Sequence, residues 1–340
     1  MEPKVCVVTV TYGNRFHLLK QVIEAVLKEG VCKVVVVDNN SEPESREKLR
    51  VYERELGNQK IKVLYLDDNY GSAGGFKRGL EEAYNDPDCE FIWLLDDDNK
   101  PMEGALKFLL DFWDSLEEEN KEEKVALSSY RPVRGSLVVE SILKNKPELI
   151  LGRKNSFFGF HVKDLPMKTI KYLRSLLNLK KIEDTKVNNF NLKYGTIPSA
   201  PYGGLFIHKN LIDNIGFPNE KFYLYVDDTE WTYRITKGGG KIYLVLESII
   251  YDLEPYWGIH GNFLIDKISK DTRRSYYAFR NAVFFEINNL VDNKIVFWIN
   301  VLVYMLIVFL FHRDISLIKV LIRAIKDAYK GNLGKIEDEW

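Results

Sequence analysis

Three consecutive carboxylates, Asp96, Asp97 and Asp98, end the apolar run 91–95. The run is short, continuous and bulky, which is typical of a buried strand. Carboxylates at the end of such a strand repel one another, and a cation would remove the cost of burying them. Because side chains alternate along a strand, we expect Asp96 and Asp98 to face one metal ion and its bound phosphates, with Asp97 turned the other way. The alternative is a solvated acidic turn that closes the strand.

A second group of acids, Asp227, Asp228 and Glu230, follows the aromatic segment 222–226 and precedes a predicted helix. Either aspartate could cap this helix, and the helix dipole would favour Glu230 in its first turn. One acid can cap the helix while its neighbour faces a pocket, so the structural and the functional interpretation are compatible.

Alternating strand and helix patterns occupy the first hundred residues. Strands are predicted at 5–11, 33–37, 61–66 and 91–95, with helices between them. This order implies right-handed crossovers and a mainly parallel sheet, which binds ligands beyond the carboxyl ends of its strands. Polar or glycine residues follow each of the four strands, so the sequence predicts one nucleotide pocket at this edge.

Several residues at these strand ends have local alternatives. Asp38 could accept a hydrogen bond from a ribose or a base, or it could form a turn with its own backbone. Gly71, Gly74 and Gly75 do not fit the dinucleotide fingerprint G-x-G-x-x-G and favour a tight turn that lets backbone approach a ligand. Asn14 is predicted to cap the first helix.

The composition bounds the class of protein. A chain of 340 residues with 46% apolar residues can build one large α/β domain and a smaller appendage. The net charge of −1 gives no reason to expect a nucleic-acid partner. Three widely spaced cysteines suggest buried side chains in a reducing compartment. The first residues lead directly into a strand pattern, so we expect no signal peptide and a cytoplasmic protein.

The second half is regular only in part. A strand is predicted at 202–207, opened by Gly203 and Gly204. Further strands are predicted at 241–246 and at 248–251, and the last ends at Asp252. The basic segment 163–193 is either an insertion that covers the pocket or a solvated helix.

The C-terminal part changes character. Residues 295–311 are apolar or aromatic apart from Asn300, at the lower limit of a membrane-spanning length. Residues 315–330 combine an isoleucine face with a lysine and arginine face, which favours a helix on an anionic membrane surface. A buried helix pair, for example at a dimer interface, is the alternative.

Taken together, these motifs resemble the family 2 glycosyltransferases of GT-A fold, and most closely their galactofuranosyltransferase-like branch. They occur in the family's order over residues 5 to 285: Val8-Thr9-Val10-Thr11-Tyr12-Gly13-Asn14-Arg15, Val37-Asp38-Asn39-Asn40-Ser41, Asn69-x-Gly71-x-Ala73-Gly74-Gly75-Phe76, Asp96-Asp97-Asp98, Asp227-Asp228-x-Glu230-Trp231 and Tyr276-Tyr277-x-x-Arg280-Asn281.

The resemblance implies a domain organisation. The fold is expected to be α/β, a Rossmann-like mixed but mainly parallel sheet flanked by helices. Residues 1–270 would form the catalytic domain, with a nucleotide-binding half at about 1–110 and an acceptor half at about 111–270. Residues 271–340 would form a helical region that associates with a membrane or with a second copy of the chain.

The resemblance also implies roles for individual residues. Asp96 and Asp98 would hold Mn²⁺ or Mg²⁺. Asp252 would replace the branch's usual histidine as third ligand, with His260 as the alternative. Asp228 would be the general base. The donor would be bound by Thr11, Tyr12, Arg15, Asp38, Asn69, Gly74 and Asp97, and the acceptor site would be shaped by Gly203, Gly204, Asp227, Glu230 and Trp231.

The function implied is an inverting, metal-dependent transfer of galactofuranose from UDP-galactofuranose. The acceptor would be a lipid-linked or polysaccharide glycan of the bacterial cell surface, reached from the inner face of the cell membrane. The alternatives are a dTDP-rhamnose-dependent rhamnosyltransferase and, outside catalysis, a silent module that binds a nucleotide sugar or serves as a scaffold.

Overall fold

The computed structural model describes residues 3–133, 135–165, 192–254, 271–312 and 315–337. Its N-terminal part alternates strands and helices, as predicted. The parallel strands are β1 (Val5–Thr11), β2 (Lys33–Asp38), β3 (Ile61–Tyr65) and β4 (Phe91–Asp96), and the helices between them are α1 (Phe16–Lys28), α2 (Pro43–Leu56) and α3 (Gly71–Asn85).

The same sheet continues beyond β4 with strands of both directions. Its order is β3-β2-β1-β4-β8-β6-β9-β5, and β7 also pairs with β9. β8 runs antiparallel to β4 and β6, whereas β6 and β9 are parallel. The added strands are β5 (Asn99–Pro101), β6 (Val125–Tyr130), β7 (Tyr194–Ile197), β8 (Leu205–His208) and β9 (Lys241–Asp252).

These directions bring the functional candidates to one edge. The carboxyl ends of β1, β2, β4, β6 and β9 meet there, together with the amino end of β8. The strands predicted at 241–246 and 248–251 are one strand, because the register between β6 and β9 shifts after Ser129 and absorbs the extra residues.

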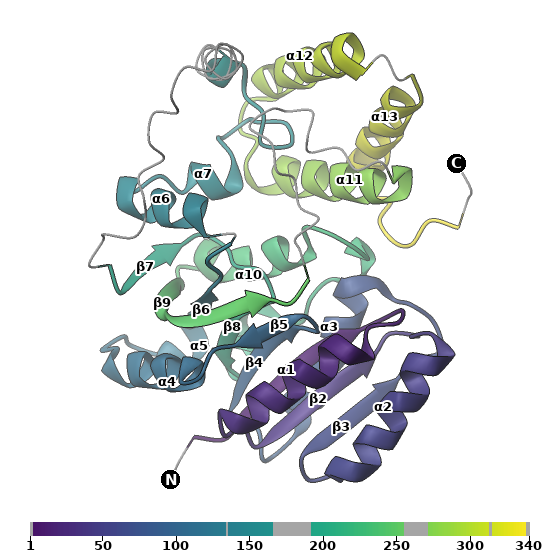
Figure 1. Ribbon diagram of the computed structural model, residues 1–340. Helices are drawn as coiled ribbons and strands as arrows, with labels where there is room; N and C mark the ends of the chain where they lie inside the picture. The colour runs from purple at the N-terminus through teal and green to yellow at the C-terminus, as the bar shows by residue number, and fades with distance from the viewer. Residues whose placement is uncertain (1–2, 134, 166–191, 255–270, 313–314, 338–340) are drawn as a thin grey trace, which may run out of the picture.

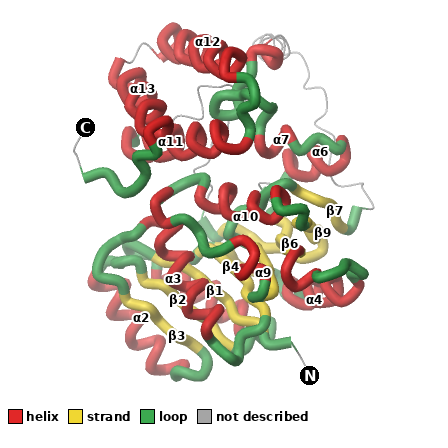
Figure 2. Tube along the Cα trace, turned by 180° about the vertical axis from the view of Figure 1, so that it is seen from behind, coloured by secondary structure: helices red, strands yellow, loops and turns green. Residues whose placement is uncertain are grey.

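Helices cover both faces of the sheet (Figures 1 and 2). α1 and α4 (Ala105–Ser115) pack on one face, where Leu19 and Leu109 surround Trp93. α3, α9 (Leu211–Ile215) and α10 (Asp227–Lys237) pack on the other, around Leu94. Neighbouring residues of β4 therefore enter opposite cores, as expected for a strand buried on both sides.

A third core lies in the helical region above the sheet (Figure 1). α11 (Thr272–Asn289), α12 (Lys294–His312) and α13 (Ile315–Lys330) enclose it. α12 contributes Phe297, Val301, Tyr304 and Val308, spaced three or four residues apart on its inner face. Within the described ranges, no helix combines the length and apolar character needed to cross a membrane. Shorter helices complete the chain: α5 (Lys121–Lys124), α6 (Ser136–Lys144), α7 (Glu148–Leu151), and the 3-10 helices η1 (Val162–Asp164) and η3 (Glu220–Phe222).

Two local predictions are corrected. α1 begins after Arg15 and has no side-chain cap, so the capping role predicted for Asn14 is wrong. The glycine segment forms a turn only at Gly71, where φ is +71°, and Gly74 and Gly75 already lie inside α3. A Cβ on Gly75 would stand 2.6 Å from the side chain of Val10, so this glycine allows α3 to pack closely on the sheet.

Candidate active site

The centre of the candidate site is Arg131, which directly follows β6 at the carboxyl edge of the sheet. Its guanidinium donates a hydrogen bond to Asp252 at the end of β9, and its Nη1 lies 3.6 Å from Oδ2 of Asp96 at the end of β4. The Arg131 side chain is only 6% exposed. A buried cation thus joins carboxylates from two strands that are far apart in the sequence.

Asn99 connects Asp98, another predicted metal ligand, to Asp252. Its Nδ2 donates to Oδ1 of Asp98 at 3.0 Å and to Oδ1 of Asp252 at 2.9 Å. Gly203 closes the arrangement, because a Cβ there would stand 2.0 Å from Oδ1 of Asn99 and 2.8 Å from Oδ2 of Asp96. The structure therefore places Asp96, Asp98 and Asp252 together, as predicted, and places Gly203 against them. Gly204, with φ of +99°, packs against Ile250 and Ser129.

Asp97 lies with Asp98 in the turn after β4, so the alternation predicted from a strand does not set its direction. It is 3% exposed, accepts a hydrogen bond from Oγ1 of Thr11 at 2.7 Å and pairs with Arg15 at 2.9 Å. Burial raises the pKa of Asp97 to about 6, against the opposing effect of Arg15. Arg15 also reaches Oδ2 of Asp98 at 3.2 Å. Thr11 and Asp97 therefore hold Arg15 beside the carboxylate group, and their contact with a donor stays a prediction.

The other predicted donor-binding residues serve mainly the loops of this edge. Asp38 is fully buried, pairs with Arg46 and accepts from the backbone N–H of Ser41 at 2.9 Å, so its turn-forming role is confirmed. Asn69 accepts from the N–H of Gly71 at 2.8 Å. Gly74 packs against Tyr70, since a Cβ there would stand 2.6 Å from that of Tyr70. Tyr12 is 45% exposed, and Arg15 lies over its ring at 5.4 Å. Nucleotide contacts at these positions stay predictions.

The second acid pair begins α10. Asp227 is 3% exposed and accepts a hydrogen bond from Oγ of Ser72 at 2.7 Å, whereas Asp228 is half-buried and accepts from the N–H of Thr229 at 2.6 Å. Neither caps the helix, because Val226 holds the cap position, so the capping interpretation is wrong. Burial raises the pKa of both acids. The charge of Asp228 raises the pKa of Asp227 further, and the charge of Asp96 raises that of Asp228.

The backbone before this pair is strained. Tyr223, Tyr225 and Val226 have φ between +64° and +67°, a region that is costly for residues with large or branched side chains. Nδ2 of Asn281 in α11 donates to three carbonyl oxygens of this segment, those of Phe222, Leu224 and Tyr225, at 2.7 to 2.9 Å. The helical region therefore holds the loop that presents Asp227 and Asp228.

Two predicted acceptor-site residues lie elsewhere. Trp231 is 0% exposed in the core, and its Nε1 donates to the carbonyl of Gly216 at 2.8 Å, so its predicted stacking on an acceptor is wrong. Trp231 lies one turn after Asp227 on α10, and both side chains are on the buried face of this helix. Glu230 is bound to Arg234 one turn later, at 2.6 Å, so the structure does not bring it to the carboxylate group.

The donor set fits a hard divalent cation. Asp96, Asp98 and Asp252 offer carboxylate oxygens, the ligands that Mn²⁺ and Mg²⁺ prefer. In the described part of the chain, no three His, Cys, Asp or Glu side chains converge as closely as in a formed metal site, because Arg131 and Asn99 stand between these carboxylates. His260, the alternative ligand, lies outside the described residues.

The N-terminal segment matches a known family. Residues 6–120, which carry the first four strands and the aspartate triplet, match Glycosyl transferase family 2. Over these residues the chain is similar to the family that its motifs resemble. No curated protein matches the chain.

Two solved structures are similar to this chain in fold. The first is GalNAc-T7 with UDP, GalNAc and Mn²⁺, with 13% identity, a TM-score of 0.51, and coverage of 83% of this chain and 51% of that one. The second is the mannosyltransferase PcManGT from Pyrobaculum calidifontis with GDP-Man and Mn²⁺, with 13% identity, a TM-score of 0.50, and coverage of 97% and 88%. This chain spans about half the length of GalNAc-T7. At such identities the likeness shows the fold, and the predicted GT-A architecture is confirmed.

Sequence reasoning missed the residues that join the elements. Arg131 follows an apolar strand at the same edge as the aspartates, and that position was a usable signal. Asn99 is adjacent to the triplet. The hydrogen bonds from Asn281 to the loop 222–226 had no local signal, because they join segments 55 residues or more apart.

Proposed function

We propose that this protein is an inverting, metal-dependent glycosyltransferase that uses a nucleoside-diphosphate sugar. The observation that carries the proposal is the meeting of Asp96, Asp98, Asp252 and Arg131 at the carboxyl edge of a family 2 domain. Asp228 is close enough for the charge of Asp96 to raise its pKa. The site is thus bordered by side chains that can bind a metal and a diphosphate and by a carboxylate, Asp228, that can accept a proton.

The chemistry assigned to these residues is a single displacement. An acceptor hydroxyl attacks the anomeric carbon as the bond from that carbon to the diphosphate oxygen breaks. The hydroxyl proton passes to Asp228, the nucleoside diphosphate leaves, and the anomeric configuration inverts. Proton transfer of this kind contributes about 10²–10⁴-fold to a rate. A bound Mn²⁺ or Mg²⁺ supplies Lewis-acid stabilisation of the leaving diphosphate, and Asp96, Asp98 and Asp252 would hold it.

The raised pKa of Asp228 suits this role. Burial destabilises its charged form, so the carboxylate is a stronger base than an ordinary aspartate. The hydrogen bonds from the N–H and the hydroxyl of Thr229 fix one carboxylate oxygen, at 2.6 and 3.2 Å. The other oxygen can then face the acceptor. Asp227, more deeply buried and bonded to Ser72, supports the position of Asp228 rather than the proton transfer.

UDP-galactofuranose is the donor that we propose, and a glycan or lipid-linked acceptor of the cell surface receives the sugar. The resemblance of the Ala73-Gly74-Gly75-Phe76 and aspartate motifs to the galactofuranosyl branch supports this choice. Nucleotide release measured over a panel of UDP-, GDP- and dTDP-sugars with Mn²⁺ tests it, and UDP-galactofuranose is expected to react fastest. A preference for dTDP-rhamnose would mean that the donor is this nucleotide sugar and not UDP-galactofuranose. Turnover of no sugar, with UDP still bound, would favour the silent binding module.

We also propose that the helical region binds to the anionic inner face of the cell membrane. α12 exposes a stripe of apolar side chains, Ile295, Ile299, Leu302, Leu306 and Leu310, each 46% exposed or more. Patches of this kind on a soluble surface mark interaction sites.

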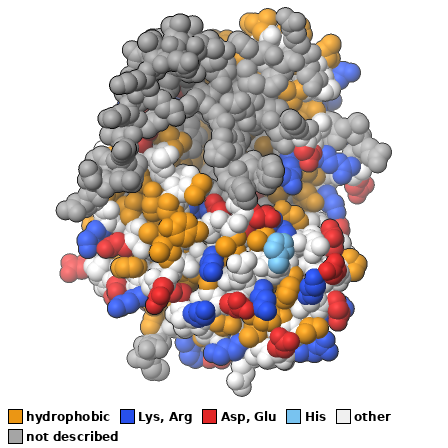
Figure 3. Space-filling view, in the orientation of Figure 1, with side chains coloured by type: hydrophobic (Ala, Val, Ile, Leu, Met, Phe, Trp, Pro, Cys, Tyr) orange, Lys and Arg blue, Asp and Glu red, His pale blue; other side chains and the backbone are white. Residues whose placement is uncertain are grey.

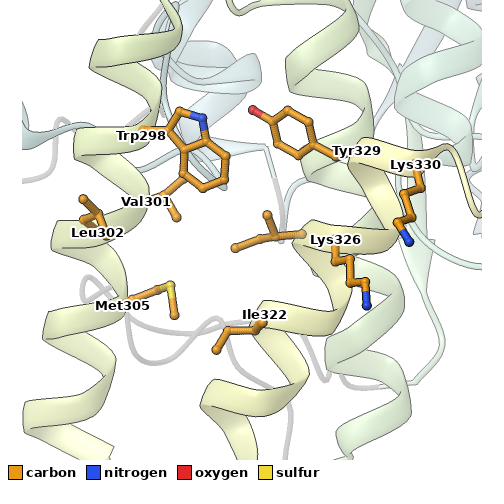
Figure 4. Close-up of a pocket in the computed structure, with 9 residues that line it drawn as sticks. Trp298, Val301, Leu302, Met305, Ile322, Lys326, Tyr329 and Lys330 are labelled. Atoms are coloured by element: carbon orange, nitrogen blue, oxygen red, sulfur yellow. The ribbon is translucent and has the colours of Figure 1, made fainter.

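A groove between α12 and α13 adjoins this stripe (Figure 4). Its volume is about 390 Å³, and apolar side chains line it, including Trp298 and Met305, with Lys326 and Lys330 at its rim. Asp327 on α13 is turned inward, where it accepts a hydrogen bond from Tyr276 at 2.9 Å. The exposed side of α13 is therefore cationic, which suits anionic lipid. Over the sheet, by contrast, Figure 3 shows Lys and Arg interspersed with Asp and Glu.

A further inference from the structure

Arg131 is a buried cation that lies on two of the carboxylates expected to hold a metal. Its guanidinium bonds Asp252 and approaches Asp96, and the side chain is 6% exposed. Its Nε is buried and has no hydrogen-bond partner among the described residues. Such a donor carries a desolvation penalty, which a hydrogen bond to a ligand would remove once the side chain moved.

Close packing and three carboxylates surround the guanidinium of Arg131. Gly203 packs so closely that an added Cβ would stand 2.8 Å from Nη1 of Arg131. The neighbouring charges are the carboxylates of Asp96, Asp252 and Asp98, and all three stabilise the cationic side chain. The guanidinium therefore lies among these carboxylates, bonded to Asp252 and 3.6 Å from Asp96.

Two cations compete for the same oxygens. A guanidinium at hydrogen-bond distance from Asp252 occupies an oxygen that a divalent metal would need. A diphosphate offers the guanidinium an alternative partner, since its planar fork binds phosphate oxygens through two parallel hydrogen bonds. Binding of a nucleoside diphosphate would therefore free the carboxylates.

We propose that Arg131 is a positioning residue that couples the nucleotide and the metal: it holds Asp96 and Asp252 in the free protein and moves to the diphosphate when the donor binds. This inference rests on the proposed function, because it assumes the metal and the nucleoside diphosphate. The coupling is reciprocal, so UDP raises the affinity for metal by the factor by which metal raises the affinity for UDP. Couplings of this kind are about 5- to 150-fold.

The competing explanation is structural. Arg131 could serve only to tie the end of β6 to the end of β9, without any effect on metal binding. The two explanations differ in the sign of one effect. If Arg131 competes with metal, its removal strengthens the binding of metal to the free protein. If it only supports the carboxylates, its removal weakens that binding or leaves it unchanged.

The test measures Mn²⁺ binding by electron paramagnetic resonance, with and without UDP, and needs no turnover. The variants are Arg131→Gln and Arg131→Lys, and the matched control is Arg153→Gln, an arginine 48% exposed and paired with Asp164. In the wild type and the control, UDP should raise Mn²⁺ affinity by at least about 5-fold. Arg131→Gln should bind Mn²⁺ alone several-fold more tightly than the wild type, with most of the UDP effect lost. Arg131→Lys should bind Mn²⁺ alone as weakly as the wild type and show a smaller UDP effect.

Thermal unfolding gives a second readout that guards against a misfolded variant. Mn²⁺ alone should raise the melting temperature of Arg131→Gln more than that of the wild type, because ligand that binds the native state stabilises it. Equal or weaker Mn²⁺ binding by folded Arg131→Gln overturns the inference and leaves the proposed function intact. If Arg131→Gln does not fold, Arg131→Lys decides, and an undiminished UDP effect in that variant overturns the inference. A wild type that binds neither UDP nor Mn²⁺ overturns the proposed function and the inference together.

Discussion

The carboxyl edge of the sheet and the outer face of α12 depart from ordinary protein structure in opposite ways. The edge buries charge: Asp97 is 3% exposed and the Arg131 side chain 6%. The helix exposes apolar surface: Leu302 is 64% exposed and Leu310 58%. Folded proteins usually keep charge outside and large apolar patches inside. Each departure carries a cost that the proposed ligands would remove: a cation with a diphosphate at the edge of the sheet, and a lipid surface at α12.

The two regions are also joined. α11 lies between them, and its Asn281 holds the strained loop that leads to Asp227 and Asp228. Arg280 adds hydrogen bonds to the carbonyls of Phe222 and Gly334, at 3.2 and 2.7 Å. The helical region is therefore a support for the candidate active site as well as a candidate membrane-facing surface.

The largest effect is expected from removing the metal. Chelation with EDTA should reduce transfer by more than about 100-fold, because the charge of the leaving diphosphate then lacks its main stabilisation. Added Mn²⁺ should restore the rate. The measurement is nucleotide release with a reactive donor, with Arg153→Gln as a control of unchanged metal dependence. Full activity in EDTA would mean that the carboxylates at this edge act without a bound metal.

A smaller effect is expected where the two regions meet. Asn281→Leu removes the donor to three carbonyls while keeping a similar volume, so the loop 222–226 should relax toward unstrained backbone. We expect a loss of about 1–3 kcal/mol in the free energy of unfolding and a lower kcat, with the affinity for UDP unchanged. The control is Asn288→Ala, an exposed position on the same helix whose amide donates to the carbonyl of Phe284. An unchanged kcat in folded Asn281→Leu would mean that the regions are independent.

The outer face of α12 can be tested alone. The double change Leu302→Glu and Leu306→Glu should lower binding to anionic phospholipid vesicles by about 10-fold or more, since it removes two exposed apolar side chains and adds negative charge. Nucleotide release by the soluble protein should not change. Leu137→Glu, on α6 and 48% exposed, is the control. Unchanged vesicle binding together with a lower oligomeric state would assign this face to a second copy of the chain.

The smallest effect on activity is expected at Trp231. Trp231→Phe removes one hydrogen bond, to Gly216, and part of a buried ring. We expect a loss of about 1–3 kcal/mol in the free energy of unfolding and an unchanged KM for the acceptor. A raised KM with unchanged stability would restore the predicted acceptor contact. Thermal unfolding and acceptor titration measure the two quantities.

Local patterns predicted the first four strands correctly. Short apolar runs that end in polar residues were enough to identify β1 to β4. The alternation predicted through the triplet does not apply, because β4 ends at Asp96 and the next two aspartates lie in a turn. Asp252 was placed with the triplet by the family resemblance, and the structure brings it there at the end of β9, beside Asn99.

The failures share one physical cause. Trp231 follows the acids in sequence, but the helix turns it into the core, where a tertiary contact with Gly216 decides its position. The capping predicted for Asn14, Asp227 and Asp228 failed because loop backbone, including the αL conformation of Val226, fixed the helix starts. The role of Arg131 depends on β6, β4 and β9 lying side by side, which no local pattern encodes.

The central claim is that Asp228 is the base of a glycosyl transfer at this edge, and the pH dependence of kcat for the wild type and Asp228→Asn tests it most directly. The base must be ionised to accept a proton, and burial raises the pKa of Asp228. The wild-type kcat should therefore increase with pH, and the midpoint of this increase should lie above the ordinary aspartate pKa of about 3.9. Asp228→Asn should bind UDP normally, transfer sugar about 10²–10⁴-fold more slowly and lack this rise. Asp114→Asn, an exposed position on α4, is the control. Transfer by Asp228→Asn at the wild-type rate, with the same pH dependence, would contradict the claim.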